Sequence, residues 1–221
     1  MHIILIRHTE SNKNIHNTFA SDKNDEQITM QGRKEAELIG VNLGKFIICR
    51  NLDIKNIYSA TSDRATQTAK IISQQIGVDV SLHENLQSIY SGVISGMSEK
   101  LVKERYPLFY YNLALYRTGL YNSYMLDRCD GEALRDFEKR VRESINEIIS
   151  IKNESIKIIV AHRSTITATL IDFARKYHGY PQDFYGYIQL NLGCLSHIEK
   201  ENGKDWNINE VNIQSDILLE T

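Results

Sequence analysis

Short apolar runs and longer amphipathic stretches alternate along the chain. A short apolar run is typical of a buried strand, and apolar residues with a period near 3.6 are typical of a helix that packs on one side. Strands are predicted at the apolar run of residues 3–6 and at the strand-like segments 55–59, 156–161 and 190–200. The amphipathic stretches predict helices at residues 29–50, 62–76, 132–151 and from about 164 onward. This alternation predicts an α/β fold, with three layers (α/β/α) built around a mostly parallel sheet.

Three of the predicted strands lead into arginine or histidine. Arg7 and His8 end the first run, and His162 and Arg163 follow the third. Arg64 follows the second run by a few residues. Parallel strands with right-handed crossovers present their carboxyl ends at one rim of the sheet, so we expect these side chains to converge. Two histidines among arginines form an anion site, and a tetrahedral phosphoryl group fits it.

Two segments depart from the alternating order. Residues 12–27 are polar and predict a long loop. Residues 97–128 are expected to form a helical insert that covers the site as a lid, and the alternative is that its aromatic residues pack on the core. These aromatic residues are Tyr106, Phe109, Tyr110, Tyr111, Tyr116, Tyr121 and Tyr124. With this insert included, residues 1–221 are expected to form one domain.

Composition limits the classes of binding partner and the cellular compartment that we expect for this chain. The formal net charge of −2 is too close to zero to favour nucleic acid or a membrane surface as a partner. Three scattered cysteines argue against a disulfide framework and favour a reducing compartment. No apolar run approaches membrane-spanning length, and the first predicted strand begins too early to leave room for a signal peptide. These observations favour a cytoplasmic protein.

The same residues fall within motifs that resemble the histidine phosphatase superfamily, in its phosphoglycerate-mutase-like branch. Arg7-His8-Thr9-Glu10 is similar to the family's Arg-His-Gly-Glu signature, with Thr9 in the place of the glycine, and Asn14 stands where the family has its following Asn. The other similar segments are residues 28–36, 57–69, 130–133 and 160–162. The resemblance covers nearly the whole chain and implies a phosphoglycerate-mutase-like fold.

The resemblance also implies the chemistry of the site. His8 is the expected nucleophile, which becomes a phosphohistidine, while Arg7, Arg64 and His162 hold the phosphoryl oxygens. The expected substrate-binding residues are Asn14, Arg163, Ser88 and Thr9. No cofactor is implied, and no metal is expected because the arginines would repel a cation. The expected substrate is a small phosphorylated metabolite.

Two departures from the family pattern bear on catalysis. Arg163 replaces the glycine that normally follows the second histidine. Ser88 occupies the position of the glutamate that acts as general acid, and a serine hydroxyl does not titrate near pH 7. Glu84, four residues earlier, is the first candidate for a relocated acid. The alternative is an enzyme without an acid, which would work mainly on activated phosphates such as aryl phosphates and phosphoanhydrides.

Three functions remain open, and a phosphatase of small metabolites is favoured. The relatively short segment between Gly96 and Glu132 and the missing glutamate argue against a phosphoglycerate mutase. The retained arginines and histidines argue against a phosphate-binding protein that has lost activity. The sequence leaves the oligomeric state open, a homodimer included.

Overall fold

The computed structural model describes residues 1–19, 27–118, 129–181 and 186–219. Within them, a six-stranded sheet has the order β3-β2-β4-β1-β5-β6. The strands are β1 (His2–Arg7), β2 (Asn56–Ser59), β3 (Asp79–Leu82), β4 (Ile156–Ala161), β5 (Leu195–Glu199) and β6 (Asn207–Ile213). β3, β2, β4 and β1 are parallel, whereas β5 is antiparallel to β1 and β6 is antiparallel to β5. The sheet is therefore mostly parallel, as predicted.

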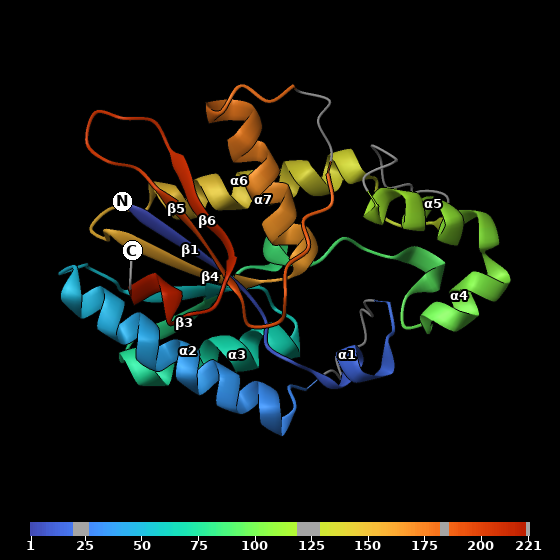
Figure 1. Ribbon diagram of the computed structural model, residues 1–221, viewed down its shortest axis with the longest axis horizontal. Helices are drawn as coiled ribbons and strands as arrows, with labels where there is room; N and C mark the ends of the chain where they lie inside the picture. Colours follow the sequence, from blue (N-terminus) through green and yellow to red (C-terminus); the bar gives the residue numbers. More distant parts are fainter. Residues whose placement is uncertain (20–26, 119–128, 182–185, 220–221) are drawn as a thin grey trace.

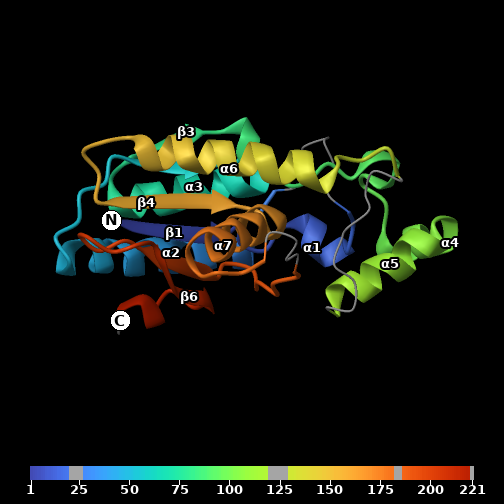
Figure 2. The same ribbon diagram turned by 90° about the horizontal axis from the view of Figure 1, so that it is seen from above.

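Helices cover both faces of the sheet (Figure 1). α2 packs against α3 on one face, and α6 packs against α7 on the other. A second view shows α4 and α5 beyond the end of the sheet, next to α1 (Figure 2). The helices are α1 (Asn12–His16), α2 (Met30–Cys49), α3 (Asp63–Ile76), α4 (Glu99–Arg105), α5 (Pro107–Arg117), α6 (Leu134–Ser150) and α7 (Arg163–Tyr177). The three-layer α/β/α architecture is thus confirmed.

The core follows from the most apolar strands. Every residue of β4 is buried, and the apolar residues of β1 are at most 1% exposed. Strands that are covered by helices on both faces are mostly apolar, and the one charged residue of β4, Lys157, is buried in an ion pair with Glu154. Leu43 and Phe46 of α2 and Val141 and Ile145 of α6 belong to the same core cluster. β1 and β4 therefore form a rigid centre from which the following residues project.

Local chemistry fixes the ends of two helices. The backbone N–H of Gly32 donates to Thr29 Oγ1 at 3.0 Å, so Thr29 caps the start of α2. Gly77 follows α3 with a φ of 82°, a left-handed conformation that glycine adopts without strain. The beginning of α3 carries Arg64 in its first turn, next to the end of β2.

The structure corrects three sequence-based expectations. Residues 12–16 form α1 instead of part of a long loop, because Asn14 Oδ1 accepts hydrogen bonds from the backbone and side chain of Ser11. The predicted strand at residues 190–200 is confined to β5 and is antiparallel. The sequence does not predict β3 and β6, because they are edge strands whose residues are mostly exposed or half-buried.

The tyrosine-rich segment forms α4 and α5 in its described part. Phe109 and Leu113 of α5 are buried, so part of this insert packs on the core. Tyr121 and Tyr124 lie outside the described residues. Across the described part of the chain, no helix combines the length and the apolar character needed to cross a membrane.

Candidate active site

The candidate site lies at the carboxyl ends of β1 and β4. These strands are parallel neighbours with Arg7 opposite Ala161, so His8 and His162 leave the sheet side by side. The backbone N–H of His8 extends this pairing by donating to Ala161 O at 3.0 Å. Arg64 comes from α3, which follows β2 on the other side of β4. The structure therefore brings His8, Arg64 and His162 together.

The hydrogen bonds of His8 define which ring nitrogen is free. Its Nδ1 lies 2.8 Å from the backbone oxygen of Thr9, which can only accept, so Nδ1 carries the proton. Nε2 is then unprotonated, and Arg64 Nε donates to it at 3.3 Å. Because the side chain is only 4% exposed, His8 presents a nucleophilic lone pair in a buried position.

His162 is held in the opposite tautomer. Gln87 Nε2 donates to Thr61 Oγ1 at 2.7 Å, which turns Gln87 Oε1 toward the imidazole. Oε1 lies 3.1 Å from His162 Nε2, so this nitrogen carries the proton. His162 Nδ1 accepts a hydrogen bond from Arg64 Nη2 at 3.3 Å. Arg64 thus connects the two rings through two of its nitrogens.

Burial keeps both imidazoles neutral. It is the largest cause that lowers the pKa of His8 and of His162 well below 6.5, and the charge of Arg64 is the next. Burial, followed by the charge of Arg163, also lowers the pKa of Arg7 to about 10, so Arg7 stays charged near pH 7. Arg7 Nη1 donates to Leu190 O, while its Nε is buried without a hydrogen-bond partner. A bound anion would satisfy this donor.

A cavity of about 280 Å³ adjoins these side chains. Arg7, His8, Arg64 and His162 line it, together with residues from α1, α5, α6 and α7. Asn14 of α1 also lines it, and because its Oδ1 faces Ser11, its Nδ2 is left to donate to a ligand. The cavity therefore combines cationic and neutral donors around the imidazole of His8.

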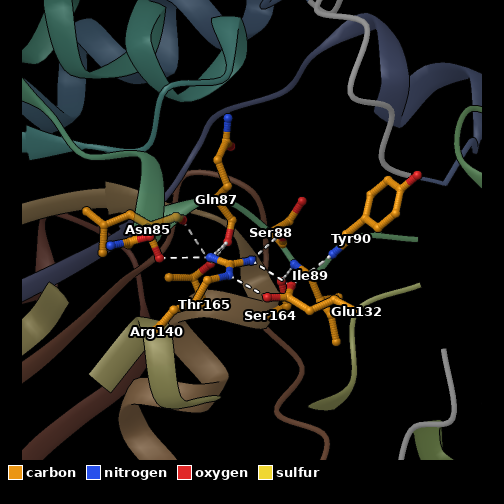
Figure 3. A network of polar contacts seen from close by, with 10 residues as sticks. Asn85, Gln87, Ser88, Ile89, Tyr90, Glu132, Arg140, Ser164 and Thr165 are labelled. Carbon is orange, nitrogen blue, oxygen red and sulfur yellow. Dashed lines mark hydrogen bonds and ion pairs between the residues drawn. The ribbon is translucent and has the colours of Figure 1, made fainter. Parts of the chain in front are cut away.

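The loop that carries Gln87 and Ser88 is fixed by Arg140 of α6 (Figure 3). This guanidinium donates to three backbone carbonyls, at 2.8 Å to Asn85 and at 3.0 Å to Gln87 and to Ser88. Its Nε and Nη2 donate to the Glu132 carboxylate at 2.6 and 2.8 Å. Bidentate pairing of this kind fixes the guanidinium plane, and hence the loop that it holds.

The structure separates the remaining predicted residues into two groups. Ser88 and Arg163 line the cavity. Thr9 does not, because its hydroxyl lies 3.1 Å from Thr68 Oγ1 and ties the end of β1 to α3. Glu84 is exposed at the start of the 3-10 helix η1 (Glu84–Leu86), and it does not line the cavity either.

Two carboxylates line the cavity, among the residues that the structure describes. Glu99 Oε1 accepts from Arg117 Nη2 at 2.8 Å. Glu138 Oε2 accepts from Arg175 Nη1 at 3.1 Å. Each carboxylate is thus engaged by an arginine.

Sequence reasoning missed two residues that shape this site, Gln87 and Arg140. Gln87 stands next to Ser88, so its position beside the expected acid was the available signal. Arg140 lies in an amphipathic helix, where a charged residue is ordinarily expected to face solvent. Its role depends on contacts with a distant loop, which periodicity does not reveal.

Three residues that could hold a metal ion lie away from this site, at the other end of β1. His2, His197 and Glu199 offer ligand atoms within 4.8 Å of one another. Burial is the largest cause that lowers the pKa of His2 and of His197, and the charges of Arg50 and of the terminal amine lower it further. These positive charges also oppose a bound cation.

Comparison with known proteins agrees with this geometry. The family model of the histidine phosphatase superfamily (branch 1) matches residues 3–214. A 2,3-bisphosphoglycerate-dependent phosphoglycerate mutase of Bartonella bacilliformis is 30% identical over 174 residues, which cover 76% of this chain and 79% of that protein. A putative phosphoserine phosphatase 2 of Hydrogenobacter thermophilus is 27% identical over 166 residues, covering 75% of each chain.

Solved structures share the fold over nearly the full length. A mycobacterial glucosyl-3-phosphoglycerate phosphatase aligns with a TM-score of 0.75 at 17% identity, covering 96% of this chain and 98% of that one. A putative alpha-ribazole-5'-P phosphatase from Escherichia coli aligns with a TM-score of 0.73 at 18% identity, covering 97% and 98%. At these identities the likeness concerns the fold.

Proposed function

The chain belongs to the histidine phosphatase superfamily, and we propose that it hydrolyses small phosphorylated metabolites through a phosphohistidine formed on His8. The observation that carries the proposal is the protonation state of the two ring nitrogens of His8. Its Nδ1 proton is committed to Thr9 O, so the Nε2 lone pair is available for attack. Arg64 donates toward that nitrogen and lies where the phosphoryl oxygens must enter.

In the proposed first step, His8 Nε2 attacks phosphorus while the bond to the leaving oxygen breaks. Negative charge on the phosphoryl oxygens is balanced by Arg7 and Arg64. Asn14 adds a neutral donor through Nδ2. His162 also lines the cavity, and it can donate to a phosphoryl oxygen once its Nδ1, which accepts from Arg64 in the free protein, takes up a proton. In the second step, water attacks the phosphohistidine, which breaks the N–P bond and returns His8 to its neutral form.

The fate of the leaving oxygen separates two versions of this proposal. Ser88 lines the cavity and cannot serve as a carboxylic acid. Glu84, the candidate for a relocated acid, is exposed outside the cavity and would need a rearrangement of its loop to reach the substrate. The mechanism without a general acid therefore has the better support. The Glu84→Gln variant tests the mechanism with a relocated acid, because loss of turnover on alkyl phosphates would identify Glu84 as that acid.

A phosphoglycerate mutase is the second candidate, because several relatives carry that name. A mutase also needs the histidine, but it returns the phosphoryl group to the substrate. Formation of 2-phosphoglycerate from 3-phosphoglycerate, with 2,3-bisphosphoglycerate as primer, would favour the mutase. Release of inorganic phosphate without isomerisation would favour the phosphatase.

The direct test is a screen of phosphorylated metabolites for phosphate release, combined with trapping of the intermediate. Acid-labile label on the wild-type protein after quenching, absent from His8→Ala, would support the proposal. Binding of phosphorylated compounds with neither label nor turnover would instead identify a phosphate-binding protein without activity.

We also propose that the insert acts as a lid that selects the substrate, a role that its described part, residues 97–118, supports. Glu99, Leu113, Tyr116 and Arg117, all from α4 and α5, line the cavity. Substitution of Tyr116 should therefore change the ranking of substrates more than it changes the fraction of enzyme that can be labelled on histidine.

The cysteines support a cytoplasmic location as part of the proposal. Cys49, Cys129 and Cys194 are all free thiols. Free thiols are typical of a reducing compartment. Localisation of a tagged chain by cell fractionation tests this expectation.

A further inference from the structure

Arg163 places an additional positive charge at the wall of the cavity. It is the first residue of α7, directly after His162, and its side chain lines the cavity. Its Nη1 donates to Tyr187 Oη at 2.6 Å, and its guanidinium carbon lies 4.9 Å from the centre of the same ring. These contacts hold Arg163 in a defined position without neutralising its charge.

Arg163 shares the cavity wall with the proposed phosphate-binding residues Arg7 and Arg64 and with the aromatic side chain of Tyr187. Arg7 lines the same cavity, and the charge of Arg163 contributes, after burial, to lowering the pKa of Arg7. Tyr187 packs edge-on against Tyr116 of α5, with 6.0 Å between ring centres. Tyr116 in turn donates to Gly186 O at 2.9 Å. Arg163 is therefore one of the charged residues on the wall of the cavity that would receive a leaving group.

The cavity offers this departing group positive charge, but its described residues offer no uncommitted carboxylic acid. Glu99 and Glu138 are each engaged by an arginine, and Ser88 does not titrate near pH 7. An alkoxide needs a proton in order to leave, whereas a phosphate leaves as a stable anion. The residues present therefore suit a leaving group that is itself an oxyanion.

We propose that the substrates are phosphoanhydrides, with Arg163 binding the phosphate that leaves. This inference rests on the proposed phosphatase function and names its substrate class. His8 Nε2 forms a bond to the terminal phosphorus, and the bridging P–O bond breaks. The electron pair of that bond stays on the bridging oxygen, so the leaving phosphate departs as an anion beside Arg163. Water then supplies hydroxide to the phosphohistidine and releases its other proton to solvent.

The test compares three substrates: inorganic pyrophosphate, p-nitrophenyl phosphate and glycerol 3-phosphate. The wild-type protein should hydrolyse pyrophosphate roughly 10²-fold more efficiently in kcat/KM than glycerol 3-phosphate, because only the alkyl ester lacks a stable leaving anion. Arg163→Met keeps the aliphatic stem and removes the charge. It should lower kcat/KM for pyrophosphate at least about 10-fold more than for p-nitrophenyl phosphate, whose leaving group has no phosphate oxygens to bind.

Two further variants separate specific effects from general ones. Arg33→Met removes an exposed arginine of α2 outside the cavity, and it should leave the ratio between the substrates at its wild-type value. Ser88→Glu adds a carboxylic acid to the cavity wall and should raise kcat/KM for glycerol 3-phosphate at least about 10-fold relative to pyrophosphate. Circular dichroism and the thermal midpoint establish that each variant is folded.

The outcomes distinguish this inference from the proposed function. If the wild-type protein hydrolyses glycerol 3-phosphate as efficiently as pyrophosphate, or if Arg163→Met lowers both pyrophosphate and p-nitrophenyl phosphate turnover equally, the substrate class is wrong. His8-dependent hydrolysis of p-nitrophenyl phosphate would still support a phosphatase. If none of the three substrates is hydrolysed in a His8-dependent manner, the proposed function fails and this inference fails with it.

Discussion

The imidazole rings of His8 and His162 lie 5.4 Å apart, centre to centre, at an angle of 63°. Arg64 donates to Nε2 of the first ring and to Nδ1 of the second. A phosphoryl group that displaces these contacts would find one ring nitrogen ready to attack and a guanidinium already oriented toward its oxygens.

His8→Ala should abolish covalent labelling and lower turnover by at least about 10³-fold, because the variant lacks the Nε2 lone pair that attacks phosphorus. His16→Ala is the matched control, since His16 is exposed on α1 and does not line the cavity. Label is measured after an acid-free quench. Wild-type turnover in His8→Ala would contradict the assignment of the nucleophile.

Arg64→Lys should lower kcat/KM on the order of 10²-fold and weaken inhibition by inorganic phosphate. Arg64 reaches both histidines from two nitrogens, whereas a lysine ammonium cannot reproduce this fork. The inhibition constant for phosphate measures the loss of the oxygen-binding site directly. A lysine variant that binds phosphate as tightly as the wild type would show that the fork is not required.

Activity should extend into mildly acidic solution. Burial and Arg64 lower the pKa of His8 well below 6.5, so Nε2 stays unprotonated as the pH falls through 6.5. The acidic limb of kcat/KM, corrected for ionisation of the substrate, should therefore appear only below that pH. An acidic limb centred at or above pH 6.5 would show that His8 titrates as an ordinary histidine.

Acid should destabilise the protein partly through His197. Burial, followed by the charge of His2, lowers the pKa of His197 to about 4. Between pH 6.5 and about 4, the unfolded chain binds a proton at this residue that the folded protein does not bind. The free energy of unfolding should therefore fall with decreasing pH, by up to about 3 kcal/mol from this residue.

The comparison of His197→Asn with His178→Asn isolates that contribution. The first variant should lose less stability than the wild type between pH 7 and pH 4.5, whereas the second removes an exposed histidine and should follow the wild type. Urea unfolding at both pH values gives the measurement. Parallel loss in all three proteins would assign the acid sensitivity to other groups.

Arg140→Lys should lower both stability and kcat. The substitution removes donors to three backbone carbonyls and breaks a bidentate pair with Glu132, which predicts a loss of about 1–3 kcal/mol. The loosened loop would also release Gln87 from His162. Arg142→Lys, on the same helix, alters only a long ion pair to Asp172 at 3.6 Å and should be nearly neutral. Equal effects from both variants would argue against a specific role of Arg140.

The layers of the fold could be predicted because the signals are local. β1 carries four apolar residues in a row and β4 is apolar apart from Lys157, and each large helix carries an apolar stripe. β3 and β6 lie at the two edges of the sheet, where few residues are buried and the pattern fades. The antiparallel direction of β5 depends on a connection whose geometry the composition does not encode.

The residues at the centre of the site could be predicted because their signals are also local in sequence. The side chains that orient them could not be predicted. His8 and His162 follow the ends of β1 and β4, and they lie at the same edge of the sheet because these two strands are parallel. The tautomer of His162 depends on Gln87, and the anchoring of Arg163 depends on Tyr187, both through side-chain contacts between distant segments. Such contacts produce no periodic pattern of residues in a single sequence, so they cannot be predicted from it.

The central position of β1 has a consequence for how the chain folds during synthesis. β1 is made before both of its neighbours in the sheet, β4 and β5, which come from the last third of the described chain. Until then its run of isoleucine and leucine has no strand to pair with, and it is a target for chaperones or for aggregation. The high sequence separation of these pairings also predicts slow folding. His8, the proposed nucleophile, thus acquires its geometry only when nearly all of the polypeptide has been translated.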